Sequence, residues 1–263
     1  MGAPAWSWVK RIVLIAAILG GALFIALWPG LPVWLRLTLV AFGGMVGVFA
    51  AFREIPAFDL RGRIRWRLPR SSTRRCAITF DDGPSKDTDR VLDILDRYGV
   101  KATFFVLSAN ARRHPDTLKR QARAGHTIAI HGTTHRKLHR LDEAAIATEV
   151  TTAIAELTTL GVPPARLYRT PHGLKNAAVF RVASSLGLQL WAWSRGVWDT
   201  DRPPPAFIVG RTLRLARDGM VLLLHDGRGD ETTPAITPMV EALPGIIEGL
   251  RAAGFSFVTL DHA

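Results

Sequence analysis

The sequence predicts an α/β fold with a largely parallel sheet, preceded by a helical hairpin that crosses a membrane. From residue 76 onward, short apolar runs alternate with helix-patterned stretches, which is typical of repeated β–α units. Before this region lie two long apolar runs, each close to the length that crosses a hydrocarbon core of about 30 Å. The chain of 263 residues is long enough for both parts.

The first 54 residues are predicted to form a two-span transmembrane hairpin. Residues 12–28 carry no charge, and residues 33–52 carry only Arg36. Between them, residues 29–32 read Pro-Gly-Leu-Pro, which favours a tight turn between two helices. A cleaved signal peptide with Lys10 and Arg11 as its basic start is the alternative interpretation.

Positive charge is concentrated near the predicted membrane segment. Residues 1–75 account for +9 of the net charge of +12. This distribution favours contact with anionic lipid headgroups, and nucleic acid is not an expected partner. Because basic residues flank both ends of the hairpin, we expect a multi-pass protein of the cell membrane with its large domain on the cytoplasmic face. The alternative is a large domain on the periplasmic or extracellular face, which would result if one of the two spans does not cross the membrane.

Residues 55–75 are predicted to form a basic, membrane-proximal linker. Four arginines in it alternate with other residues, as in an interfacial strand or an extended linker: Arg61, Arg63, Arg65 and Arg67. We expect them to contact lipid phosphates, and they could also hold the phosphate of a lipid-linked substrate. The single cysteine, Cys76, excludes an internal disulfide.

Seven strands are predicted in the large domain, with helices between them. The helix pattern places Val91, Leu92 and Leu95 on one face, and a longer helix is expected to begin after Asp142 as its N-cap. The predicted strands are Cys76 to Phe80, Ala102 to Leu107, Thr127 to Ile130, Leu167 to Thr170, Leu188 to Trp193, Met220 to His225 and Phe255 to Leu260.

Two adjacent carboxylates end the first of these strands. Asp81 and Asp82 are followed by Gly83-Pro84, a turn signal that ends the strand and lets both side chains face one site. Neighbouring carboxylates repel each other, so a partly buried pair needs a cation, a shared proton or an arginine. Taken alone, this stretch would also suit a surface turn.

Other titratable residues follow four further strands. His131 and His135 are four residues apart, a spacing that lets both imidazoles reach one ion. Because chemistry collects at the carboxyl ends of strands in such folds, these groups are expected to meet. The other three stretches are Arg169 to Gly173, Trp193 to Asp199 and Leu223 to Gly227.

The chain resembles the polysaccharide deacetylases of the NodB-homology type, carbohydrate esterase family four. Five motifs carry the resemblance and follow the family's order: the TFDDGP stretch at Thr79, the HxxxH pair at His131, the RxPxG stretch at Arg169, the Trp-to-Asp segment and the LxH ending. The resemblance covers roughly residues 76 to 260. It implies a distorted (β/α)7-type barrel, with residues 76–263 as the catalytic domain. It also implies metal-dependent removal of an N-acyl group, acetyl or formyl, from an amino sugar.

The resemblance implies a divalent cation held by Asp82, His131 and His135. Two imidazoles and one carboxylate suit zinc, and cobalt or nickel are chemically admissible. Asp81 matches the general base, which takes a proton from water on the cation, and Arg169 matches the arginine that keeps it ionised.

His225 matches the general acid that protonates the leaving amine, and Asp199 matches the carboxylate that keeps the ring protonated. The backbone N–H of His172 matches the donor that stabilises the tetrahedral oxyanion. His126 and His139 flank the histidine pair, and we expect both to be surface residues.

Three positions depart from the family pattern. Gly132 replaces a usual Ser or Thr, so a hydrogen bond that stiffens the metal loop is expected to be missing. His172 replaces a common aromatic residue, which would change how a sugar stacks. The fourth motif reads Trp198-Asp199 where the order Asp-Trp is usual.

The leading hypothesis is a membrane-bound N-deacetylase that acts on an amino sugar in a polysaccharide or a lipid-linked glycan precursor. A cytoplasmic site favours the lipid-linked precursor, and an external site favours peptidoglycan or a secreted polysaccharide. Two alternatives are a two-carboxylate glycoside hydrolase and a non-catalytic, membrane-anchored glycan-binding module. Adjacent Asp81 and Asp82 fit the first poorly, because its acids stand about 5 to 10 Å apart across a sugar ring.

Overall fold

The computed structural model describes residues 30–54, 63–229 and 236–262, and for residues 44–54 the backbone alone. Contacts divide the chain into two compact units, Met1–Ile55 and Pro56–Ala263. In the first unit, helix α2 (Val33–Glu54) coincides with the second predicted span. The first predicted span lies outside the described residues. No helix in the described part of the chain is long and apolar enough to cross a membrane, so the hairpin stays a prediction.

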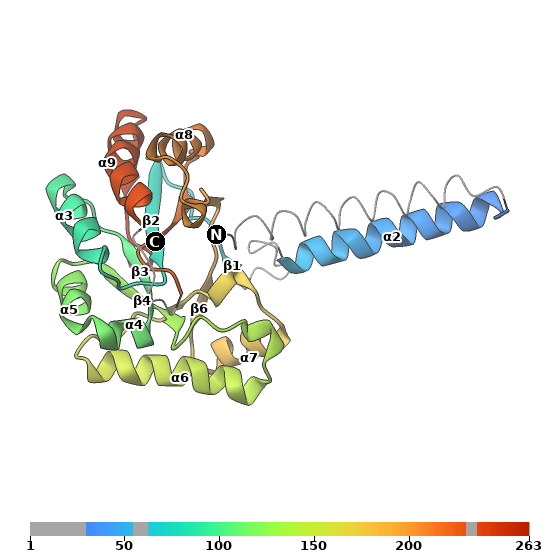
Figure 1. Ribbon diagram of the computed structural model, residues 1–263, viewed down its shortest axis with the longest axis horizontal. Coiled ribbons are helices and arrows are strands. Elements are labelled where there is room, and N and C mark those ends of the chain that lie inside the picture. The colour runs from blue at the N-terminus through green and yellow to red at the C-terminus, as the bar shows by residue number, and fades with distance from the viewer. Residues whose placement is uncertain (1–29, 55–62, 230–235, 263) are drawn as a thin grey trace. The chain divides into compact units, whose positions relative to one another are not determined.

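The second unit is built on one curled parallel sheet (Figure 1), which has nine strands within the described residues. Their order is β1-β6-β5-β4-β3-β2-β8-β7, and β9 pairs with the first residues of β2. The strands are β1 (Ile64–Arg65), β2 (Arg75–Asp81), β3 (Thr103–Leu107), β4 (Thr127–Gly132), β5 (Leu167–Tyr168), β6 (Gln189–Trp191), β7 (Arg195–Gly196), β8 (Met220–His225) and β9 (Ser256–Phe257).

Helices cover the outer side of the curled sheet (Figure 1). They are α3 (Thr88–Tyr98), α4 (Ser108–Arg113), α5 (Pro115–Arg123), α6 (Glu143–Thr159), α7 (Ala177–Ser185), α8 (Pro205–Leu215) and α9 (Thr237–Ala252). Short 3₁₀ turns lie at Leu138–Arg140, Pro171–Gly173, Asp199–Asp201 and Leu260–His262. Helix α6 begins at its predicted cap, because the Asp142 carboxylate accepts a hydrogen bond from the N–H of Ala145 at 2.8 Å.

The predicted α/β class and parallel sheet are confirmed, and all seven predicted strands coincide with observed ones. The barrel is only half formed, because the strand order has two ends, at β1 and β7. Burial on both faces of the sheet explains why the sequences of the central strands are continuous apolar runs. Strands β2 and β3 are covered on both faces, and Phe80 stacks on Phe104 with ring centroids 5.0 Å apart. Cys76 is fully buried in this core, and burial raises the pKa of its thiol to about 12.

The predicted linker joins the second unit. Ile64 of β1 is buried and pairs with Leu190 of β6, so this segment is in part a sheet edge. Its arginines contact the protein: Arg63 lies over the Phe180 ring at 3.7 Å, Arg65 lies 5.9 Å from the Trp191 ring, and Arg67 donates to the carbonyl of Asp218. Arg61 lies outside the described residues.

The expectation that His126 is a surface residue is wrong, because its side chain is buried. The ring lies edge-on against Phe104 with centroids 5.3 Å apart, and Nδ1 accepts a hydrogen bond from the N–H of Ala102 at 3.2 Å. Burial lowers the pKa of His126 to about 4. The folded protein therefore holds this imidazole neutral at pH values where the unfolded chain protonates it.

We expect acid to destabilise the wild-type protein more than a His126→Gln variant. A depressed pKa in the folded state means that the unfolded state binds more protons below pH 6.5, so stability falls as the pH falls. Between pH 6.5 and pH 5 the wild type should lose about 2 kcal/mol of unfolding free energy more than the variant. Urea unfolding at several pH values measures this difference. His262→Gln is the matched control, because that ring is 83% exposed, and equal pH slopes in wild type and His126→Gln would contradict the assignment.

Candidate active site

The carboxyl ends of the strands bring the predicted groups to one cavity of about 490 Å³. Asp81 ends β2 and stands in register with His225, the last residue of the neighbouring β8. His131 is the second-to-last residue of β4, and Arg169 directly follows β5. The cavity is lined by Asp81, Asp82, His131, His135, His172, Gly173, Trp193, Thr200, Leu223, His225, Arg228 and Gly229.

A left-handed backbone lets both adjacent carboxylates reach this cavity. Asp82 has φ 74°, so the chain turns immediately after the last residue of β2 instead of continuing the alternation of a strand. The side-chain amide of Asn110 donates to the Asp82 carbonyl at 2.7 Å. The Oδ2 atom of Asp82 accepts from the N–H of Gly229 at 2.9 Å. Together these contacts fix the second carboxylate against the cavity.

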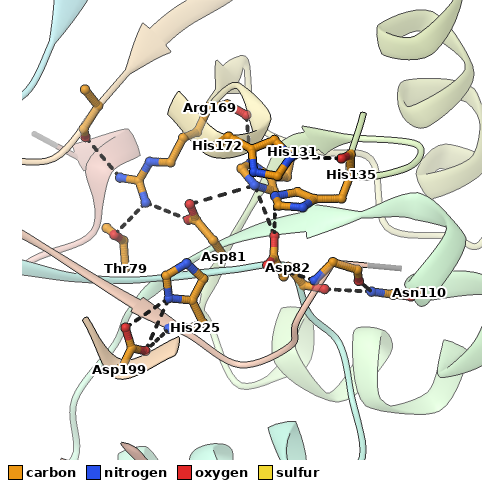
Figure 2. A network of polar contacts seen from close by, with 12 residues as sticks. Thr79, Asp81, Asp82, Asn110, His131, His135, Arg169, His172, Asp199 and His225 are labelled. Carbon is orange, nitrogen blue, oxygen red and sulfur yellow. Dashed lines mark hydrogen bonds and ion pairs between the residues drawn. The ribbon is translucent and has the colours of Figure 1, made fainter. Parts of the chain in front are cut away.

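Asp82, His131 and His135 form a candidate metal site (Figure 2). Oδ1 of Asp82 lies 3.2 Å from Nε2 of each histidine, and the three ligand atoms lie within 4.8 Å of one another. Nδ1 of His131 donates to the carbonyl of Arg169 at 2.8 Å, since a carbonyl can only accept. In the neutral ring this contact leaves the lone pair on Nε2, the arrangement found in metal-binding histidines.

One oxygen of the buried Asp82 carboxylate, Oδ1, has no hydrogen-bond donor among the described residues. Burial alone would raise the pKa of Asp82, but the two imidazoles outweigh it and hold the pKa well below its usual range. Burial also lowers the pKa of His135 to about 3, against the opposing charge of Asp82. A divalent cation is bound by a carboxylate and by imidazole nitrogens, and these three residues supply one carboxylate and two such nitrogens within 4.8 Å of one another, so the donor set fits such an ion.

Asp81 is held by the guanidinium of Arg169 and not by the histidines. Nη1 of Arg169 donates to Oδ1 of Asp81 at 2.7 Å and to the hydroxyl of Thr79 at 2.8 Å, and Nη2 donates to the carbonyl of Ala192 at 3.1 Å. Arg169 is fully buried, which lowers its pKa. Its guanidinium lies 4.0 Å from the centre of the Phe105 ring. The second oxygen of Asp81, Oδ2, lies 3.9 Å from Nε2 of His131, which is farther than the 3.2 Å between that nitrogen and Asp82.

The half-buried His225, the last residue of β8, pairs with the buried Asp199, which follows β7 (Figure 2). Nδ1 of His225 lies 3.1 Å and 3.3 Å from the two Asp199 oxygens, and its backbone N–H donates to Oδ2 at 2.8 Å. Burial alone would lower the pKa of His225, but the Asp199 carboxylate outweighs it and raises the pKa to about 10. The pair therefore holds a protonated imidazole that can donate from its other nitrogen.

The two family departures near the metal residues have structural compensations. The loop after Gly132 is fixed by Glu149 of α6, whose carboxylate accepts from the N–H and the hydroxyl of Thr134 at 2.5 and 2.9 Å. The His172 ring lies 4.0 Å from the His135 ring, and its Nε2 donates to the carbonyl of His135 at 3.2 Å. His172 thus packs on a metal-site residue, in a turn where its own backbone has φ 58°.

Four residues with contacts in the site were not among the predicted groups. Thr79 fixes Arg169, Asn110 fixes Asp82, and Gly229 donates to Asp82. Arg228 lines the cavity. Thr79 belongs to the quoted strand-end motif, and Arg228 and Gly229 follow the His225 motif directly, so position at a strand end was the available signal. Asn110 lies in a helix and carried no such signal.

The fold and the site together define an α/β enzyme with acid–base groups and a candidate metal centre at the strand ends. The family model for polysaccharide deacetylase matches residues 69–191. The chain is 32% identical over 204 residues to a peptidoglycan-N-acetylglucosamine deacetylase of Bacillus cereus, covering 76% of this chain and 92% of that protein. It is 36% identical over 218 residues to a chitooligosaccharide deacetylase of Rhizobium leguminosarum bv. trifolii, covering 80% of this chain and 97% of that protein.

A solved structure agrees with these matches. The crystal structure of a peptidoglycan N-acetylglucosamine deacetylase superposes with a TM-score of 0.70 at 30% sequence identity, covering 76% of this chain and 92% of that chain. The chain belongs to the polysaccharide deacetylases, carbohydrate esterase family four. It is a carbohydrate N-deacetylase, and the glycoside hydrolase and the non-catalytic module are therefore set aside.

Proposed function

We propose that this protein hydrolyses the amide of an N-acyl amino sugar and releases a free amine and acetate or formate. The observation that carries the proposal is the ionised Oδ1 of Asp82 facing two imidazoles, beside a second carboxylate fixed on Arg169. Asp82, His131 and His135 would hold a divalent cation, with zinc best suited and cobalt or nickel admissible. When bound, such a cation lowers the pKa of water and polarises the acyl oxygen.

The proton transfers fall to two residues on neighbouring strands. Asp81 accepts a proton as the water oxygen bonds to the acyl carbon, and Arg169 keeps this carboxylate in place. His225 gives its proton to the nitrogen as the carbon–nitrogen bond breaks, because an amine is too poor a leaving group to depart as an anion. Asp199 holds the imidazole in the charged, donating form. The register of Asp81 with His225 supports this division, since base and acid flank one bond.

The backbone N–H of His172 is proposed as the donor to the acyl oxyanion. His172 lines the cavity and packs on His135, which places its turn beside the candidate metal centre. Its ring would then offer a face to the sugar in place of the more common aromatic residue.

The substrate is proposed to be a glycan that contains N-acetylglucosamine. Support comes from the relatives, which are named for peptidoglycan N-acetylglucosamine and for chitooligosaccharides. A lipid-linked precursor of such a glycan is the other proposed form, and it depends on where the enzyme is anchored.

Anchoring to the cell membrane by the N-terminal hairpin is also proposed. Support comes from helix α2, where Trp34, Leu37 and Phe42 expose 68%, 66% and 59% of their surface, a face that an apolar environment would cover. The excess of basic residues near the hairpin favours the cytoplasmic face for the catalytic unit, and the periplasmic or extracellular face is the alternative. Protease treatment of intact cells and of lysed cells distinguishes them, because an external domain is cleaved in both.

One experiment tests the reaction and its metal together. The purified protein is incubated with chitooligosaccharides, peptidoglycan fragments and a lipid-linked N-acetyl amino sugar, and released acetate or formate is measured. We expect turnover of at least one substrate, its loss by a factor of 100 or more after chelation, and recovery with zinc, cobalt or nickel. Turnover that survives chelation, with no metal left in the protein by mass spectrometry, would reject the metal centre.

A further inference from the structure

One cationic side chain of the cavity takes no part in the contacts described so far. Arg228 lines the cavity together with the base, the acid and the candidate metal residues, and it is half-buried. No hydrogen bond or ion pair joins its guanidinium to another described residue. An arginine in this position has up to five N–H donors to offer.

The backbone that carries Arg228 is fixed against the candidate metal centre. A Cβ atom on Gly227 would come within 2.5 Å of the Asp82 carbonyl oxygen, and one on Gly229 would come within 3.3 Å of Nδ1 of His135. Gly229 also donates to Asp82 and accepts from Asn110 at 2.7 Å. A side chain at Gly227 would overlap the Asp82 backbone, and Gly229 has a left-handed φ of 60° that favours glycine, so the segment lies close against Asp82 and His135.

The acidic groups of the site already have partners. Asp81 is paired with Arg169, and Asp199 is paired with His225. Asp82 faces the two metal-site imidazoles and would also share the cation. None of these three carboxylates pairs with Arg228, so within the described residues of the site its guanidinium faces the cavity without an acidic partner.

We infer that Arg228 binds an anionic substituent, a carboxylate or a phosphate, carried by the amino-sugar substrate close to the N-acyl group. This inference rests on the proposed function and names the class of substrate. A guanidinium matches either anion because its planar fork can donate two parallel hydrogen bonds. Among the described residues no carboxylate would neutralise this half-buried charge when a neutral glycan is bound, whereas an anionic glycan would be bound and oriented by it.

Three matched tetrasaccharides of N-acetylglucosamine test the inference and identify the anion. One is neutral, one carries lactyl ethers on alternate units, and one carries a phosphate at its reducing end. For each, kcat/KM is measured by acetate release at constant low ionic strength. We expect the wild type to favour at least one anionic substrate over the neutral one. In Arg228→Gln that preference should fall about tenfold or more, since a hydrogen bond to a charged group contributes about 1.5 to 3 kcal/mol.

The two charged substrates distinguish a carboxylate from a phosphate as the bound anion. A loss confined to the lactyl substrate identifies a carboxylate, and a loss confined to the phosphorylated substrate identifies a phosphate. Arg97→Gln is the matched control, because Arg97 is exposed in the last turn of α3 and does not line the cavity. An unchanged preference in Arg228→Gln, or a wild type that favours the neutral substrate, overturns the inference.

A binding measurement distinguishes failure of the Arg228 inference from failure of the proposed function. In an Asp81→Asn background, where hydrolysis is blocked, calorimetry gives the affinity for each tetrasaccharide without turnover. Weaker binding of the anionic ligand alone after Arg228→Gln supports the inference, and equal binding overturns it. Absence of acetate release from all three substrates, together with no release of acetate or formate from the chitooligosaccharides, peptidoglycan fragments and lipid-linked sugar of the assay above, would instead reject the proposed function.

Discussion

An Asp81→Asn variant is expected to lose a factor of about 10² to 10⁴ in kcat, because a positioned general base contributes that much to the rate. Asparagine keeps the shape of the side chain and an oxygen that can accept from Arg169, but its amide cannot take a proton from water. Asp82, His131 and His135 are untouched, so metal content should stay at the wild-type level. Acetate release and metal analysis on the same preparation measure both quantities.

A fold control is needed because Arg169 is fully buried. Loss of its charged partner costs stability, so thermal unfolding is compared with that of Asp116→Asn, a change in the first turn of α5. A folded, metal-loaded Asp81→Asn protein with undiminished deacetylation would show that Asp81 is not the base.

An Asp199→Asn variant is expected to lower kcat by roughly 100-fold and to move the alkaline limb of the pH–rate profile to lower pH. The Asp199 carboxylate raises the pKa of His225 to about 10, and in the proposed reaction the protonated ring is the acid. Activity therefore falls as the pH rises through this pKa. Removing the negative charge lowers the pKa, so the fall begins at a lower pH. A pH series of kcat measures the shift.

Asp201→Asn is the control for this change, because Asp201 lies in the same 3₁₀ turn but is exposed. It should keep the wild-type profile. If Asp199→Asn leaves the alkaline limb where it is in the wild type, then His225 does not act as an acid whose charge depends on Asp199.

The long, periodic elements of the fold were predictable from the sequence. Strands β2, β3 and β8 read as continuous apolar runs because both their faces are covered. Strands β1 and β7 were missed because each pairs only two residues, one of which is an arginine, so neither lies in an apolar run. Ile64 is also surrounded by arginines, so the sequence around it suggested a surface segment although it is buried.

The predicted site residues come together because strand ends meet at one edge of a parallel sheet. That argument fixes the neighbourhood of Asp81, His131 and His225 but gives no contacts. The pairing of Asp81 with Arg169, for example, depends on a side chain that crosses the interior between β5 and β2. His126 was misplaced because polar character suggested exposure, whereas its ring packs on Phe104 and accepts from a backbone N–H.

Arg228 lay outside the prediction for a different reason. Its importance comes from the close approach of Gly227 and Gly229 to residues more than ninety positions earlier in the chain. Such a contact leaves no periodic signal, and the sequence shows only a glycine-flanked arginine after a strand.

Arg169 contacts the proposed base and the candidate metal site through different atoms. Its guanidinium holds Asp81, and its main-chain oxygen orients the His131 ring. The two contacts can therefore be changed independently. Exchanging the Arg169 side chain would alter the surroundings of the Asp81 carboxylate, and the main-chain oxygen would still accept from Nδ1 of His131. An engineer who wants to alter the surroundings of Asp81 and keep the contact that orients His131 can therefore exchange this one side chain.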